Sequence, residues 1–268
     1  MSTPLPLPMR ILVNGPSTVF WSSGMGGPRT DMHFPRVAEQ ILRAGGRPVE
    51  FRLSGGFGSP TRQMFDDWDE LVAKWSPDVV VISAGFWETV HILQPPFIER
   101  RANTEHRRVG RFGYYKRRRQ IFRALSRLVL KLQARLDKPG GRVGRAAARR
   151  ALVDTQTLID MTSRVGSPLI LLLGSHQNAS SRDAMFSGWE QRRLELDENL
   201  RALAEKNAHK NVRVLPVRDL IEQLQPLTRD ELFSDGIHYA PQFHRAVGER
   251  LAAIAEEWAR TQPHLDLP

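Results

Sequence analysis

Three residues near opposite ends of the chain have the side chains of a serine nucleophile and its general base. Ser17 follows the apolar run Met9–Val13, and Asp235 and His238 lie three residues apart near the carboxyl end. A serine hydroxyl is a weak nucleophile at neutral pH and needs a base to take its proton. Histidine titrates near neutrality, and a carboxylate fixes its tautomer and stabilises the imidazolium. These residue types predict acyl transfer if the two ends of the chain meet.

A first strand is predicted to carry Ser17 to one edge of a sheet. The apolar residues 9–13 stop just before Gly15, and a loop rich in Gly, Ser and Pro spans residues 14–33. In open α/β sheets, ligands and reacting groups gather at the carboxyl ends of the strands. Asp235-Gly236 is also typical of an ordinary turn before a helix. The loop alone therefore leaves a turn and a catalytic site open.

The rest of the chain alternates strands with helices. We expect strands at residues 48–53, 79–82, 168–174 and 212–217. We expect helices, most of them with an amphipathic pattern, at residues 34–44, 64–75, 151–165, 189–206 and 243–258. Runs of β-branched and other apolar residues, as in Val79–Ile82, are typical of strands buried on both faces. The alternation predicts an α/β fold, with a parallel sheet between two layers of helices.

Length and composition limit the classes of protein. A chain of 268 residues is long enough for one large α/β domain, and we predict a single domain over 1–268. The absence of cysteine excludes disulfides, cysteine-based zinc sites and thiol catalysis. No apolar run approaches the roughly 18 residues of a membrane span, and residues 1–8 lack a signal-peptide core. We therefore expect a cytoplasmic protein with no transmembrane segment, and no histidine pair has the spacing of a metal site.

One segment makes the chain basic. Residues 100–150 hold 18 Lys and Arg against two acidic residues, so they carry +16 while the remainder carries −6. We interpret residues 95–150 as an insertion or lid, with an amphipathic helix over 121–136. It is either a solvated lid or a docking surface for an anionic partner: coenzyme A, an acidic acyl carrier protein or an anionic lipid surface. Nucleic acid ranks last, because no nucleic-acid motif accompanies the charges.

Four short blocks, in their order along the chain, resemble those of the SGNH (GDSL-type) hydrolase family. They are Gly15-Pro16-Ser17-Thr18, the glycine-rich segment with Gly58, Val79–Glu88, and Asp235-Gly236-Ile237-His238. The resemblance covers the chain except the basic insertion, and it implies a flavodoxin-like three-layer α/β/α sandwich. It also implies a triad of Ser17, His238 and Asp235, and an oxyanion hole that includes the backbone N–H groups of Ser17 and Gly58.

The sequence departs from the family pattern at two positions. Pro16 stands in place of an Asp that flanks the nucleophile and is not part of the triad. Trp87 stands in place of the Asn that donates to the oxyanion. Loss of one such donor costs about 10²–10³ in rate. Trp87 is either a substitute donor through its indole N–H, a wall of the acyl pocket, a packing residue or the mark of a lost activity.

Three more polar residues are predicted to line a substrate pocket. His33 ends the loop after the first strand, Glu88 closes the third block, and His176 follows the strand at 168–174. Gly56-Phe57-Gly58 is similar to a dinucleotide-binding loop, but the third glycine is absent and the loop follows the second strand. We therefore predict neither a nucleotide cofactor nor any other.

The leading hypothesis is a serine acyl hydrolase, an esterase that forms an acyl-enzyme on Ser17. One alternative is an acyltransferase that takes its acyl group from coenzyme A or a carrier protein. The other is a non-catalytic binding protein on the same scaffold, which the replacement at Trp87 favours. Fold alone does not choose among them, because one scaffold hosts many functions.

Overall fold

The sheet has five strands, and its order is that of flavodoxin-like proteins. The computed structural model describes residues 7–19, 21–22, 27–28, 33–56, 60–90, 92–93, 95, 97–98, 101, 114–137, 142–175 and 188–265. Within them the strands of the sheet are β1 (Met9–Pro16), β4 (Val49–Gly56), β5 (Val79–Ile82), β6 (Leu169–Leu173) and β7 (Val212–Leu215). Their spatial order is β4-β1-β5-β6-β7, and every neighbouring pair is parallel.

This order reverses direction at β1, which lies between β4 and β5. The chain first moves outward from β1 to β4 and then crosses back to β5. At such a switch point the connections leave the sheet on opposite sides, and a crevice opens at the carboxyl ends of the strands. The end of β1 is therefore the place in this fold where a ligand is expected.

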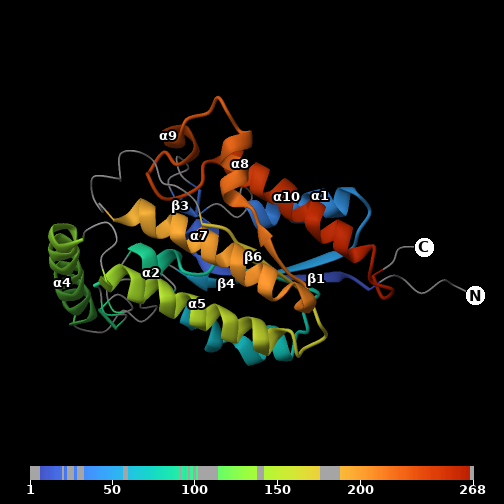
Figure 1. Ribbon diagram of the computed structural model, residues 1–268, viewed down its shortest axis with the longest axis horizontal. Coiled ribbons are helices and arrows are strands. Elements are labelled where there is room, and N and C mark those ends of the chain that lie inside the picture. The colour runs from blue at the N-terminus through green and yellow to red at the C-terminus, as the bar shows by residue number, and fades with distance from the viewer. Residues whose placement is uncertain are drawn as a thin grey trace, which may run out of the picture.

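Helices cover both faces of the sheet. They are α1 (Phe34–Ala44), α2 (Phe86–Val90), α4 (Tyr114–Leu136), α5 (Arg142–Thr162), α7 (Trp189–Lys206), α8 (Val217–Gln223), α9 (Arg229–Leu232) and α10 (Pro241–Ala259). Figure 1 shows α1 and α10 on one side of the sheet and α5 on the other. A short antiparallel pair, β2 (Trp21–Ser22) and β3 (Gly27–Pro28), lies outside the main sheet. The predicted three-layer sandwich is confirmed.

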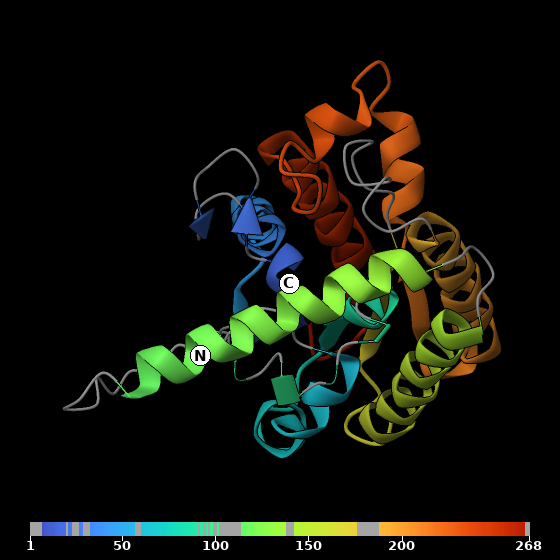
Figure 2. The same ribbon diagram turned by 90° about the vertical axis from the view of Figure 1, so that its left-hand side faces the viewer.

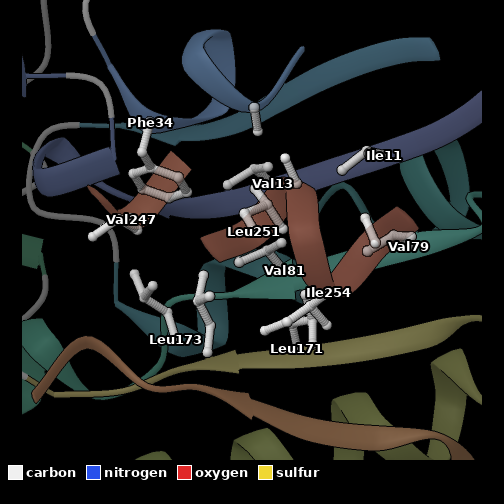
Figure 3. Packing of buried hydrophobic residues seen from close by; sticks show 14 of the residues in the cluster. Ile11, Val13, Phe34, Val79, Val81, Leu171, Leu173, Val247, Leu251 and Ile254 are labelled. Atoms are coloured by element: carbon white, nitrogen blue, oxygen red, sulfur yellow. The ribbon is translucent and has the colours of Figure 1, made fainter. Parts of the chain in front are cut away.

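Two apolar cores follow from the alternation of side chains along the strands. Ile11 and Val13 of β1 face α1 and α10, whereas Leu12 faces the layer that contains α5 and α7. Figure 3 shows the first of these cores, where α10 residues such as Leu251 meet the strands. All residues of β5 and β6 are buried, which agrees with strands covered on both faces.

Several element boundaries differ from the sequence-based expectations. β1 continues through Gly15 to Pro16, because it pairs residue by residue with β4 up to Gly56. The helix expected at residues 64–75 is a 3₁₀ turn (Thr61–Phe65) followed by a π turn (Asp69–Ala73). Helix α5 begins at Arg142 and not at residue 151, so it overlaps the end of the segment predicted as an insertion. The division into one domain with an insertion at 95–150 stays a prediction.

The basic helix α4 lies at the end of the molecule opposite the start of β1 and the end of α10 (Figure 1). Figure 2 shows it crossing that end. The Gln133 side chain bonds the backbone at Val90 and at Leu93, just beyond α2. Since α2 follows β5, α4 lies at the edge of the sheet where the strands end. None of the helices in the described ranges is long and apolar enough to cross a membrane.

Candidate active site

Ser17 lies directly after β1, at the switch point of the sheet. It begins a 3₁₀ turn, Ser17–Val19, and its side chain is largely buried. The tight turn needs Gly15, because a Cβ there would lie 2.5 Å from Val19 Cγ2 and 2.6 Å from Ser83 Cβ. The 3₁₀ turn is therefore held closely between the end of β1 and the residues that follow β5. This packing fixes the position of the Ser17 hydroxyl.

The loop that carries Asp235 and His238 is fixed at its base by aromatic packing. Phe233, Tyr239 and Phe243 are buried, and their rings pack edge to face with centroids 4.8 to 5.9 Å apart. The N–H of Ala240 donates to Leu232 O at 2.8 Å and closes the loop. Residues 234–238 therefore project from a rigid base, and the start of α10 follows at once.

Asp235 shapes this loop with one of its carboxylate oxygens. Oδ1 accepts hydrogen bonds from the N–H groups of Ile237 at 2.9 Å and His238 at 2.8 Å. Gly236 takes a positive φ of 81°, which completes the turn at little steric cost. The second oxygen, Oδ2, is turned toward the ring of His238. Asp235 thus forms the turn and also contacts the histidine, the two possibilities that the sequence leaves open.

Ser17, His238 and Asp235 form a continuous chain of hydrogen bonds. His238 Nε2 lies 2.9 Å from Ser17 Oγ, and His238 Nδ1 lies 2.6 Å from Asp235 Oδ2. Burial by itself would raise the pKa of Asp235, but the hydrogen bonds from the His238 ring and from the two backbone N–H groups lower it to about 2. An ionised Asp235 only accepts, so Nδ1 carries the proton and Nε2 accepts from the serine hydroxyl.

Trp21 lies against this histidine, which the sequence patterns do not predict. Its ring stacks on the His238 ring, with centroids 5.4 Å apart and planes 27° apart. The backbone of Trp21 is in turn held by His244, whose Nε2 donates to Trp21 O at 3.3 Å. Trp21 occurs in a loop of irregular sequence, where no periodicity indicates which side chain points inward.

His244 is a second residue that the sequence analysis missed. Its Nδ1 accepts from the N–H of Phe34 at 3.2 Å, and a backbone N–H only donates, so Nε2 carries the proton. Burial lowers the pKa of His244 to about 3, and His244 is therefore neutral at ordinary pH. It joins the start of α1, α10 and the Trp21 segment. A histidine in the apolar pattern of the last helix is the sequence signal that indicates burial.

Glu88 joins the β5–α2 turn to the segment that follows β4. Its Oε1 accepts from Thr61 N at 2.8 Å, and the Thr61 hydroxyl accepts from Gly85 N at 2.8 Å. The carboxyl is buried, which raises the pKa of Glu88 despite its hydrogen bonds. Its Oε2 is buried and receives no hydrogen bond within the described part of the chain. The hydrogen bond that Glu88 accepts therefore positions the backbone at Thr61. The predicted role of Glu88 in binding substrate stays a prediction.

The other predicted site residues are placed as follows. His33 is buried and caps α1, where its Nδ1 accepts from Arg36 N at 3.3 Å. Trp87 is half-buried in α2, directly before Glu88. Gly58 and His176 lie outside the described residues. Neither the pocket role of His33 and His176 nor the oxyanion role of Gly58 and Trp87 is tested by these observations. No cluster of three or more metal-ligating side chains occurs among the described residues.

Comparisons with known proteins link this geometry to a fold. No protein-family model matches the chain, and no curated protein matches it at a significant level. Among solved structures, the chain is similar to Axe2, an acetylxylan esterase from Geobacillus stearothermophilus, with 13% identity and a TM-score of 0.55. That match covers 97% of this chain and 95% of Axe2.

Two more solved structures agree with this match. A lipase/acylhydrolase from Enterococcus faecalis has 14% identity and a TM-score of 0.58, with 94% of this chain and 97% of that one covered. A protein described as a GDSL-like lipase from Parabacteroides merdae has 14% identity and a TM-score of 0.59, with 94% and 98% covered. At these identities the likeness concerns the fold, and it confirms the predicted SGNH-type fold over nearly the whole chain.

Proposed function

We propose that this chain, which shares its fold with GDSL-type lipases and esterases, is a serine hydrolase of carboxylic esters. The observation that carries the proposal is the hydrogen-bonded series Ser17 Oγ–His238 Nε2 and His238 Nδ1–Asp235 Oδ2, at 2.9 and 2.6 Å. These distances lie within the range in which a base takes the proton of a nucleophile. The structural neighbours support the same reaction class, since their names describe esterases and lipases.

In the proposed reaction, Ser17 Oγ attacks the carbonyl carbon of the ester while its proton moves to His238 Nε2. The tetrahedral intermediate collapses, and His238 returns the proton to the alcohol oxygen as the carbon–oxygen bond breaks. Water then attacks the acyl-enzyme and gives a proton to His238, and that proton passes to Ser17 Oγ as the acid leaves. Asp235 stays ionised throughout and stabilises the imidazolium.

The proposed reaction also needs hydrogen-bond donors to the oxyanion of the tetrahedral intermediate. The family resemblance assigns this task to the backbone N–H groups of Ser17 and Gly58, with Trp87 in the position of the third donor. The contact between Glu88 and Thr61 N holds the segment after β4 against the start of α2, which carries Trp87. We infer an oxyanion hole in which the backbone N–H groups of Ser17 and Gly58 are the two donors. Hydrolysis should then be slower by about 10²–10³ than with a third donor.

The test is labelling with a fluorophosphonate, which reacts only with an activated serine. We expect wild type to be labelled, and Ser17→Ala and His238→Ala to remain unlabelled. Ser175→Ala is the matched control, because Ser175 follows the end of β6 and its hydroxyl contacts Arg193 Nε at 3.3 Å. This variant should be labelled like wild type. A folded wild type that takes no label would contradict the proposal and favour the binding protein.

Substrate range is measured with p-nitrophenyl esters from acetate to octanoate, because the neighbours include both an acetyl esterase and lipases. Hydrolysis that is lost in Ser17→Ala would agree with the labelling. An added alcohol acceptor that takes most of the acyl group would instead indicate an acyltransferase. The cytoplasmic location expected from the sequence stays a prediction.

A further inference from the structure

Helix α4 presents a row of apolar side chains to solvent. Its members follow one another at spacings of three or four residues, so they share one face of the helix. Their exposed fractions are 64% for Ile121, 38% for Leu125, 63% for Leu128, 50% for Leu132 and 60% for Leu136. A single exposed leucine needs no explanation, whereas a continuous apolar row on one helix indicates a binding surface. We call these five residues the leucine row.

A row of cations winds toward the leucine row and adjoins it in the carboxyl-terminal half of α4, where positions 131 and 135 lie three residues after Leu128 and Leu132. It consists of Arg123, Arg127, Lys131 and Arg135, all of which are exposed. No acidic residue occurs anywhere between 114 and 136. The cations are therefore not neutralised within their own helix, and the leucine row lies next to a strip of uncompensated positive charge.

The opposite side of α4 is attached to the body of the protein. Leu130 packs against a small cluster of Phe86, Val90 and Trp189, and Ile237 packs against the same cluster. Ile237 lies between Asp235 and His238 in the chain, so α4 contacts the surroundings of the catalytic loop. Gln133 is fully buried and bonds the backbone at Val90.

A buried ion pair holds the carboxyl end of α4. Asp137 binds Arg192 through two hydrogen bonds, at 2.6 and 3.0 Å, and both side chains are almost fully buried. Arg192 also donates from Nε to Thr89 O at 2.9 Å. These contacts fix which side of α4 faces inward. The leucine row is thus held outward by the fold.

We propose that α4 docks the protein on an anionic lipid surface. Helices that lie in a membrane interface combine an apolar face, which enters the boundary between headgroups and acyl chains, with Lys and Arg on the polar side. The leucine row and the cation row supply these two parts. The lipid binds along the length of the helix, and anionic headgroups neutralise the cation row.

Charge argues against a second copy of the chain, and shape argues against an acidic protein partner. A second copy of α4 would bring a cation row against a cation row, because the helix contains no acidic residue. An acidic protein partner would match the charge, but it would need a groove shaped to five large side chains along the helix. A lipid surface requires no such groove. The docked surface would also lie beside the edge of the sheet that carries Ser17, where esters from the lipid phase would arrive.

The test measures sedimentation of the full chain with phosphatidylcholine vesicles that do or do not contain phosphatidylglycerol. Replacement of the four cations of the cation row by Gln should weaken binding to the anionic vesicles on the order of 10³-fold, given the attraction of each cation to such a surface. The control replaces four other exposed cations by Gln, with the same change of charge: Lys74, Arg245, Arg250 and Arg260. The control should bind as wild type does.

A second variant tests the apolar part without any change of charge. Ile121, Leu128 and Leu136 are replaced by Ser, and we expect binding to fall by about tenfold or more. Ser replacements of Ile41, Leu53 and Val153, which are also exposed, serve as the control. Circular dichroism and hydrolysis of a water-soluble ester report whether each variant is folded. The vesicle measurements are repeated with Ser17→Ala, so that failure of the proposed catalysis does not affect the result.

Three outcomes would overturn the proposal. The first is equal binding of wild type to neutral and anionic vesicles, or no binding to either. The second is a cation-row variant that binds anionic vesicles as tightly as its control. The third is a dimer in sedimentation velocity that the Ser replacements in the leucine row dissociate, which would assign the row to a second copy of the chain.

Discussion

Replacement of Asp235 by Asn tests the proposed role of this carboxylate with little change to the loop. The Asn side chain keeps one oxygen, which accepts from the N–H groups of Ile237 and His238 as Oδ1 does at 2.9 and 2.8 Å. Its amide NH₂ replaces Oδ2, which lies 2.6 Å from His238 Nδ1. Two donors would then face each other. The histidine relieves this conflict by moving its proton to Nε2.

The size of the effect follows from this change of tautomer. A hydrogen bond to a charged group contributes about 1.5–3 kcal/mol, so its loss alone would lower the rate on the order of 10–10²-fold. An Nε2 that already carries a proton does not accept one from Ser17. In a serine protease the same replacement lowers kcat by about 10⁴. We expect a loss of about 10⁴ in kcat here as well, equivalent to about 5 kcal/mol of transition-state stabilisation.

The assay is kcat/KM for a p-nitrophenyl ester, together with the melting temperature of each variant. Asp235→Asn should melt close to wild type, whereas Asp235→Ala should also lose stability, since it removes the acceptor for two backbone N–H groups. If folded Asp235→Asn keeps more than about a hundredth of the wild-type kcat, loss of the hydrogen bond alone explains the effect and the tautomer argument is wrong. The pKa of Asp235, at about 2, also implies that a loss of wild-type activity in mild acid does not come from this residue.

Three more predictions concern the groups around the site. Folded His244 is neutral, with a pKa of about 3 against an ordinary 6.5, so the unfolded chain binds a proton first as pH falls. The free energy of unfolding of wild type should therefore fall by on the order of 3 kcal/mol between about pH 6.5 and 4. The urea midpoint of His244→Phe should depend less on pH. Asp137→Asn leaves Arg192 buried without its anion and should lower the free energy of unfolding in urea by about 3–5 kcal/mol. The double variant Asp137→Leu with Arg192→Met should recover most of that free energy, because it removes both buried charges. Because the pKa of Glu88 is raised, wild type should lose stability as pH rises from the ordinary carboxyl range through that pKa. Glu88→Gln keeps an acceptor for Thr61 N and should melt at or above the wild-type temperature at pH 8. Glu88→Ala removes that acceptor and should lower the free energy of unfolding by about 1–3 kcal/mol. Equal pH slopes in either titration variant and wild type would contradict the assignment of that group.

The sequence predicts the fold well wherever a single physical signal dominates. The run Val79–Ile82 reads as a strand covered on both faces, and all four residues are buried in β5. Helices α1 and α7 have the predicted limits, Phe34–Ala44 and Trp189–Lys206, because an apolar face repeats along each. Gly15 and Pro16, which usually interrupt strands, suggest that β1 ends before them, but the pairing of β1 with β4 continues to Gly56. Strand pairing supplies energy that local propensity does not contain.

The candidate site is predictable in part for a similar reason. Ser17, Asp235 and His238 are chemically distinctive, and their order along the chain indicates that they meet. Trp21 has no such signal, and the apolar pattern around His244 indicates its burial but not its partners, since both residues act through contacts between segments far apart in the sequence. Trp21 stacks on His238, and His244 bonds the backbone of Trp21. Such contacts exist only after the sheet has brought the two ends of the chain together.

The ion pair between Asp137 and Arg192 makes the basic segment and the rest of the fold depend on each other. A buried Arg192 without its anion is costly, and Asp137 alone would be costly as well. The segment is therefore not removable from an otherwise unchanged domain. Its partner Arg192 lies in α7, 55 residues further along the chain, so the basic segment and α7 depend on each other. We expect related chains that lack the segment to carry an uncharged side chain where Arg192 stands, and chains that have it to retain both charges.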